Sequence, residues 1–170
     1  NIEIIIVDDG STDKGREIIS RYYKKGVKII FQKNKGAAHA RNTGIKSAQG
    51  EFIQFMDADD LLSEDKIEMQ VSALINNPNK VAVCNYVEFF DNEDNYSKPI
   101  AENQKYFIYS TNDPVNFLLN LWGVNGSSNF IQTNSWLIPK KLIESAGCWR
   151  EFRCPDDDGE FFTRIILKSS

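Results

Sequence analysis

The chain has 170 residues, 41% of them hydrophobic and 26% charged, which is the size and composition of one globular domain with its own core. The net charge of -4 argues against a general nucleic-acid surface, because binding to a nucleic-acid backbone depends on clustered Lys and Arg. No apolar run approaches the ~20 residues that a membrane span needs.

The first part of the chain alternates strand and helix patterns. Residues 2–7 form an apolar run rich in β-branched side chains, which predicts a buried strand. Apolar residues at helical spacing predict a helix over 15–25, and residues 27–31 repeat the strand pattern. Residues 34–50 predict a loop followed by a helix of small residues that Gly50 ends.

The same alternation continues through the middle of the chain. Residues 52–56 predict a third strand, residues 63–77 a helix that begins with a partial capping box at Ser63, and residues 81–90 a further strand. Strands that alternate with helices favour right-handed crossover connections. We therefore predict an α/β fold with a mainly parallel central sheet and helices on both of its faces.

The remaining sequence is less regular. Polar residues over 91–110 predict a surface loop, an amphipathic pattern predicts a helix over 114–122, and residues 130–138 resemble a strand. Pro139 suits the first position of a helix that ends at Gly147. The sequence starts inside a strand pattern and stops inside an apolar helical pattern, so we expect a single domain that is cut at both ends.

Two acidic clusters follow predicted strands. Asp8 and Asp9 end the first strand, and Asp57, Asp59 and Asp60 end the third. In an open parallel sheet the carboxyl ends of the strands form the ligand-binding edge, so these carboxylates can converge there. Hard oxygen ligands suit Mg²⁺ or Mn²⁺, and strand alternation would place Asp57 and Asp59 on one side.

Each cluster also has an alternative interpretation as a helix cap or an ordinary turn. For Asp57 and Asp59 we favour ligand binding. Three carboxylates within four residues destabilise the fold through repulsion, and a cap needs only one of them.

Three stretches together resemble one enzyme family. They are IIIVDDGSTD at 4–13, the run from Asn34 to Asp60, and PDDDGEFFTR at 155–164. In this combination and order the chain resembles the nucleotide-binding part of family 2 glycosyltransferases of the GT-A type. The resemblance implies a Rossmann-like GT-A sandwich, with residues 1–90 as the nucleotide-binding half and residues 91–170 as the acceptor-side half.

The resemblance also implies roles for individual residues. Asp57 and Asp59 match the Asp-x-Asp element that binds the metal, Mn²⁺ or Mg²⁺, and the donor diphosphate. Contacts to the nucleotide are implied for the residues that match the family's other motifs, which are Asp8, Asp9, Gly36, Arg41 and Asn42.

A third acidic cluster matches the position of the family's catalytic base. Family members carry an acidic pair before an Arg on a helix, and Asp157 and Asp158 precede Arg164. We predict Asp158 as the base. Asp157 is the alternative, because this chain departs from the family pattern: it has Asp where the family usually has Glu, and it has a third carboxylate at Asp156. Alternatively, Asp156 to Asp158 cap the helix over 159–167, which is compatible with one of the three also being catalytic.

The expected function is that of an inverting, metal-dependent glycosyltransferase in polysaccharide or glycoconjugate assembly. Its expected partners are a UDP-sugar donor and a saccharide or lipid-linked acceptor, with no nucleic acid. We expect it in the cytoplasm, at the inner face of the membrane if segments outside this sequence attach it there, in an oligomeric state that the sequence leaves open. One rival is a non-catalytic nucleotide-sugar-binding module. Another is a sugar nucleotidyltransferase, although that class usually begins with a Gly-rich loop and a Lys that are missing here.

Overall fold

A computed structural model describes residues 1–89, 99–124, 126, 128–152 and 154–169. The predicted strand over 81–90 and loop over 91–110 extend into residues that lie outside the described ones. The elements in chain order are β1 (Ile5–Asp8), α1 (Gly15–Ser20), η1 (Tyr23–Lys25), β2 (Lys28–Phe31), α2 (Ala37–Ser47), β3 (Phe52–Ile53), α3 (Lys66–Leu74), β4 (Ala82–Val83), η2 (Glu102–Tyr106), α4 (Pro114–Leu121), η3 (Thr133–Ser135), β5 (Trp136–Pro139), α5 (Lys140–Ala146) and α6 (Asp157–Lys168).

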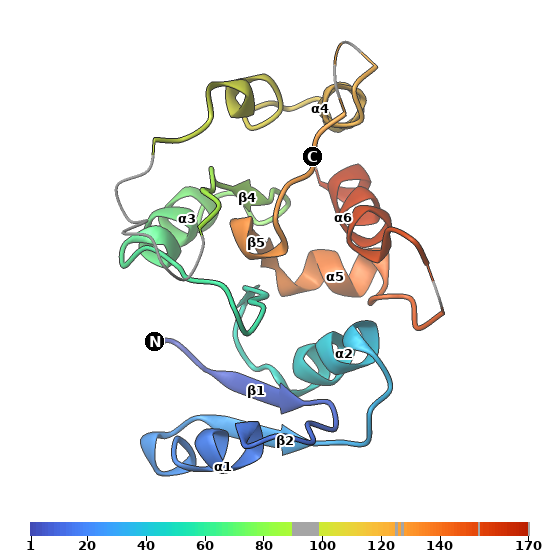
Figure 1. Cartoon of the computed structure of the whole chain (residues 1–170). Helices are drawn as coiled ribbons and strands as arrows, with labels where there is room; N and C mark the ends of the chain where they lie inside the picture. Colours follow the sequence, from blue (N-terminus) through green and yellow to red (C-terminus); the bar gives the residue numbers. More distant parts are fainter. Residues whose placement is uncertain (90–98, 125, 127, 153, 170) are drawn as a thin grey trace.

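The first sheet pairs β1 with β2 in parallel, with Ile6 opposite Ile29. The crossover between them contains α1 and η1, as the strand, helix and strand patterns predict. Helix α2 packs on β1 and lies between this pair of strands and the helices α5 and α6 (Figure 1). This position lets side chains of α2 reach both the early strands and the last third of the chain.

The second sheet has the order β3-β5-β4, and β5 runs antiparallel to both neighbours. Ile53 of β3 lies opposite Ile138, and Val83 of β4 lies opposite Trp136. The predicted α/β class is confirmed. The predicted parallel pairing holds for β1 and β2, whereas β5 makes the pairing of the second sheet antiparallel.

Several boundaries differ from the sequence prediction. The predicted strand over 130–138 is confined to β5, because residues 133–135 form the short 3₁₀ helix η3. Pro139 is the last residue of that strand, opposite Phe52, and α5 begins one residue later. Helix α3 begins at Lys66, and Ser63 therefore makes no capping box.

Aromatic side chains fix α6 against the rest of the core. Trp149 stacks on Phe161 at 4.1 Å between ring centroids, and Trp136 stacks on Phe162 at 4.8 Å. The helix starts where Asp156 accepts a hydrogen bond of 2.8 Å from the amide of Gly159, which confirms the predicted cap. The start of α6 is therefore held by the Asp156 cap and by the stacking of Phe161 and Phe162 on the two tryptophans. Among the described helices, none has the length and apolar character needed to cross a membrane.

Candidate functional site

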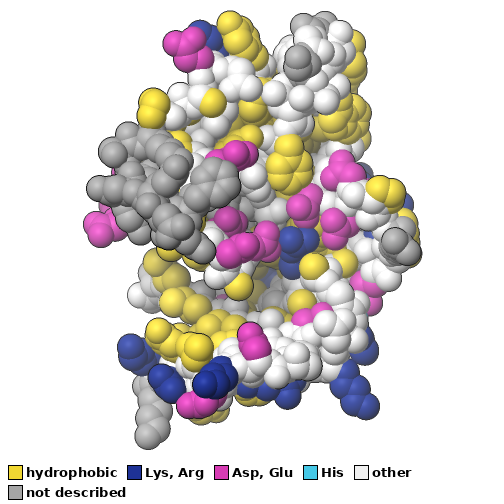
Figure 2. All heavy atoms as spheres, in the orientation of Figure 1, with side chains coloured by type: hydrophobic (Ala, Val, Ile, Leu, Met, Phe, Trp, Pro, Cys, Tyr) yellow, Lys and Arg dark blue, Asp and Glu magenta, His cyan; other side chains and the backbone are white. Residues whose placement is uncertain are grey.

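Arg41 of α2 is the basic residue around which the predicted acidic groups meet. Its Nη1 lies 2.8 Å from Oδ1 of Asp158 and 3.8 Å from Oδ2 of Asp157. Its Nη2 lies 3.2 Å from Oδ1 of Asp57. Figure 2 shows acidic side chains gathered around basic ones in the middle of the displayed face. The structure therefore brings the acidic segment after β3 together with the first turn of α6.

Asp158 is held through both of its carboxylate oxygens. Oδ1 accepts a hydrogen bond from Arg41, and Oδ2 accepts one of 3.0 Å from Oγ1 of Thr133. Burial raises the pKa of the Asp158 carboxyl, and the charges of Asp157 and Asp57 act in the same direction. The Arg41 charge and the Thr133 hydrogen bond oppose this rise in pKa without cancelling it. A fixed carboxylate with a raised pKa is suited to accept a proton.

Residues 57–60 form a turn, since β3 stops at Ile53 and the amide of Asp60 donates to the carbonyl oxygen of Asp57. Strand alternation therefore does not set the directions of Asp57 and Asp59, and both side chains are exposed. Burial raises the pKa of Asp60, and the charges of Asp57 and Asp59 raise it further. The turn thus concentrates negative charge at its surface.

This turn suits a divalent cation that arrives together with ligand oxygens. Among the residues that the structure describes, no group of three or more His, Cys, Asp or Glu side chains is arranged to hold a metal ion by itself. Mg²⁺ typically takes one or two carboxylates, and phosphate oxygens and water complete its shell. The like-charge repulsion at Asp60 is compatible with such a cation, and Asp57 and Asp59 are the residues that could hold it.

Asp8 is buried at the end of β1, with 3% of its surface exposed. Its Oδ1 accepts hydrogen bonds from the amides of Gly10 and Ser11 and from Nε of Arg16. Burial opposes ionisation, but these hydrogen bonds outweigh it and lower the pKa of Asp8. Its Oδ2 is buried and has no hydrogen-bond partner in the described part of the chain. The Asp8 side chain is fully buried, so its ionised carboxylate orders the turn at Gly10 and Ser11 from inside the fold.

Asp9 faces the loop that leads into α2. Its carboxylate accepts hydrogen bonds from Nε2 of Gln32 at 2.6 Å and from the amides of Lys35 and Gly36 at 3.0 and 2.7 Å. Burial raises the pKa of Asp9, and these hydrogen bonds lower it by more. Gly36 has a φ of 93°, which disfavours any residue with a Cβ. Asp9 and Gly36 thus shape the entry of α2 next to the site.

Asn42 ties α2 to the segment before α6. Its Nδ2 donates to the carbonyl oxygen of Trp149 at 2.8 Å, and its Oδ1 accepts from the amide of Trp149 at 2.9 Å. A third hydrogen bond of 2.9 Å joins Nδ2 to Oε1 of Glu151. The Trp149 ring then lies under the Arg41 guanidinium, 4.3 Å from its carbon. Asn42 therefore positions the ring that supports Arg41.

Two hollows flank α3. One, of about 790 Å³, is lined in part by Asp59, Asp60, Gln132 and Asn134. These last two residues flank Thr133, which is bonded to Asp158, so this hollow adjoins the acidic site.

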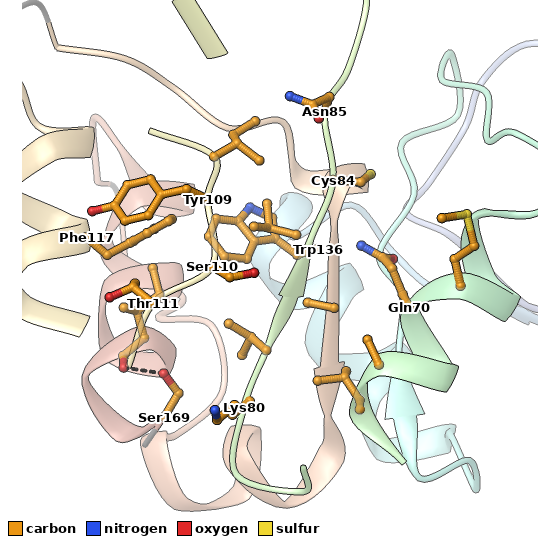
Figure 3. Close-up of a pocket in the computed structure, with 18 of the residues that line it drawn as sticks. Gln70, Lys80, Cys84, Asn85, Tyr109, Ser110, Thr111, Phe117, Trp136 and Ser169 are labelled. Carbon is orange, nitrogen blue, oxygen red and sulfur yellow. Dashed lines mark hydrogen bonds between the residues drawn. The ribbon is translucent and has the colours of Figure 1, made fainter. Parts of the chain in front are cut away.

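The second hollow has a volume of about 860 Å³. Figure 3 shows Tyr109 and Phe117 on one side of it, Gln70 of α3 on the other, and Trp136 between them. Its lining contains none of the predicted site residues.

Sequence reasoning missed two residues of this site. Thr133 belongs to no motif, and Trp149 carries only the general signal of a core aromatic. Arg164, which follows the acidic pair, does not face Asp158. It donates to the carbonyl oxygens of Ala146, Gly147 and Cys148 and so fastens α6 to the segment after α5.

The model of one protein family, Glycosyl transferase family 2, matches residues 1–144. The chain belongs to this family. The predicted resemblance is therefore confirmed. An uncharacterized glycosyltransferase from Haemophilus influenzae is 43% identical over 108 residues, which are 62% of this chain and 43% of that protein. Glycosyltransferase GlyA from Streptococcus pneumoniae is 32% identical over 137 residues, which are 72% of this chain and 20% of GlyA. This chain spans less than half the length of either relative.

Solved structures of the S. aureus protein TarS share the fold of this family 2 chain. The structure of TarS 1-349 in complex with UDP matches 98% of this chain and 46% of that one, with a TM-score of 0.73 and 19% identity. A second TarS structure gives a TM-score of 0.71 at 20% identity and covers 98% of this chain and 28% of that one. At such identities the likeness establishes the fold alone, and it confirms the predicted GT-A type.

Proposed function

We propose that this family 2 domain binds a nucleoside diphosphate-sugar and transfers its sugar to a hydroxyl group of a saccharide or lipid-linked acceptor. The observation that carries the proposal is that Arg41 forms ion pairs with both Asp57 and Asp158. Transfer requires the leaving diphosphate and the general base to lie within reach of each other. The UDP bound in the TarS structure supports a UDP-sugar as the donor.

The proposed reaction is a direct displacement at the anomeric carbon. The Asp158 carboxylate takes the proton of the acceptor hydroxyl while the hydroxyl oxygen forms a bond to that carbon. The bond from the carbon to the diphosphate breaks at the same time, and its electron pair leaves with the diphosphate. Attack from the face opposite the leaving group inverts the anomeric configuration. We prefer Asp158 to Asp157 because its side chain is 21% exposed against 41% and is bonded on both oxygens.

The other site residues hold the donor. Asp8 orders the turn at Gly10 and Ser11 at the nucleotide end of the site, while Asp9 and Gly36 shape the loop beside it. Asp57 and Asp59 would hold Mg²⁺ or Mn²⁺, which when bound neutralises charge on the diphosphate. The hollow lined by Asp59 and Asp60 has room for the transferred sugar and for part of an acceptor.

Calorimetric titration of the protein with UDP, GDP and UDP-sugars, with and without Mn²⁺, tests this function. We expect UDP to bind, Mn²⁺ to strengthen the binding, and Asp59→Asn to remove the metal effect. Affinity that is unchanged in Asp59→Asn would refute the role of the turn. If Asp158→Asn binds the donor but no longer turns it over, the domain is an enzyme, and if the wild type binds the donor without turnover, it is a binding module.

A further inference from the structure

Arg41 is shared between two groups that have different tasks in the proposed reaction. Nη1 donates a hydrogen bond to Asp158, the proposed base, and Nη2 donates one to Asp57, a residue that we propose binds the donor. The Arg41 side chain is only 15% exposed and that of Asp158 21%, so their contact is largely shielded from bulk water, where charge-assisted hydrogen bonds are strong, whereas the Asp57 side chain is 48% exposed. A single guanidinium therefore joins the two halves of the site.

The guanidinium is also fixed in position. The Trp149 ring lies beneath it at 4.3 Å, and the backbone of Trp149 is held by Asn42, the residue next to Arg41 in α2. On its other face the ring stacks on Phe161 of the core. The Arg41 guanidinium therefore has little freedom to move toward one carboxylate and away from the other. An incoming ligand has to compete with these carboxylates for the guanidinium in its present position.

We propose that Arg41 is a positioning residue that couples donor binding to the state of Asp158, because the donor diphosphate competes with Asp158 for the same guanidinium. This inference rests on the proposed function. Guanidinium groups pair readily with phosphate oxygens, so an arriving diphosphate weakens the bond to Asp158. Asp158 then keeps its hydrogen bond from Thr133 and loses its cation, which frees it to take the acceptor proton. The donor therefore binds before the base becomes available.

Linkage makes the coupling reciprocal. If the diphosphate weakens the contact between Arg41 and Asp158, then that contact weakens diphosphate binding by the same factor. Removing the Asp158 charge should accordingly tighten UDP binding, and most of the gain should depend on Arg41. A gain caused only by the loss of a nearby negative charge would occur without Arg41 as well.

A double-mutant cycle measures this dependence. UDP is titrated calorimetrically, in buffer with Mg²⁺, into the wild type, Asp158→Asn, Arg41→Gln and the double variant. We expect Asp158→Asn to tighten UDP binding about fivefold or more in the wild-type background and far less in the Arg41→Gln background. Asp157→Asn is the matched control, because it removes the same charge from a more exposed carboxylate 3.8 Å from Arg41. Its gain should be clearly smaller.

Equal gains from Asp158→Asn in both backgrounds would overturn the coupling while leaving the proposed function intact. If the wild type binds no UDP, the proposed function fails and the coupling fails with it. Thermal unfolding of each variant checks folding. If Arg41→Gln does not fold, Arg41→Lys replaces it in the cycle, since it keeps the charge and loses the planar group that can serve two partners. The gain from Asp158→Asn should fall in that background too, and an undiminished gain would overturn the coupling.

Discussion

Thr133 begins η3, the short helix that precedes β5, and its Oγ1 donates a hydrogen bond of 3.0 Å to Oδ2 of Asp158 in α6. This bond fixes the orientation of the carboxylate that we propose as the base. It also helps to keep the carboxylate ionised, because a hydrogen bond to the charged form lowers the pKa.

Thr133→Val should therefore slow donor turnover. Loss of one hydrogen bond to a charged group costs about 1.5 kcal/mol, or roughly tenfold in kcat, with a smaller change in KM. Because the pKa of Asp158 rises when the bond is lost, the acid limb of the pH profile should move to higher pH. Steady-state kinetics across pH measure both effects. Thr133→Ser keeps the hydroxyl and should retain the wild-type profile, and an unshifted limb in Thr133→Val would contradict the positioning role.

Asp158→Asn should stabilise the fold at neutral pH. The folded-state pKa of Asp158 is raised above its ordinary value of 3.8, so the native protein holds this proton more tightly than the unfolded chain does. Stability is then lost as pH rises through the window from 3.8 to the raised pKa, and it stays lower above that window. We expect urea unfolding at pH 7 to show a higher free energy of unfolding for Asp158→Asn than for the wild type. The gain should disappear below pH 3.8, where the wild-type carboxyl is protonated in both states. A gain that is equal at both pH values would argue against titration as its cause.

Asn42→Asp should destabilise the protein strongly although the two side chains have the same shape. The new carboxylate can still accept from the amide of Trp149, but it cannot donate to the Trp149 carbonyl and it repels Glu151. We expect a loss of about 3 kcal/mol in urea unfolding. Asn77→Asp is the control, since Asn77 is exposed and its side chain donates to the carbonyl oxygen of Ala73, and it should change stability by about 0.5 kcal/mol or less.

Gly36→Ala should weaken both stability and UDP binding. The space around Gly36 is open, so the cost comes from its backbone, with φ 93° and ψ 163°, a region that is nearly exclusive to glycine. We expect a loss of about 1–3 kcal/mol. Gly26→Ala provides the comparison, because Gly26 also has open space but adopts the milder left-handed conformation with φ 79° and ψ 11°. Its loss should be smaller, near 1 kcal/mol, and UDP affinity should not change.

Local patterns in the sequence predicted several elements of the fold. The strand and helix periodicities located β1, β2 and α2, and the clustered carboxylates marked 57–60 and the start of α6. Strand direction was not accessible in this way, because a period of two residues is the same in parallel and antiparallel strands. The antiparallel pairing of β5 therefore had to come from the structure.

Long-range contacts at the site were inaccessible for a related reason. Asn42 is separated from Trp149 by 107 residues, and Arg41 is separated from Asp158 by 117. No local pattern reports such pairs. The family resemblance drew attention to Asn42 and Asp158, but it did not indicate that Asn42 holds a tryptophan backbone or that Thr133 completes the support of Asp158.

The strand order β3-β5-β4 has a consequence for how the chain acquires its structure. β3 and β4 do not pair with each other, and the strand between them is β5, which ends at residue 139. When synthesis has passed Val83 but has not reached Trp136, both strands lack their shared partner. Such early strands are prone to pair with other chains, and contacts that are distant in sequence form slowly. The second sheet therefore cannot be completed until β5 has been synthesised.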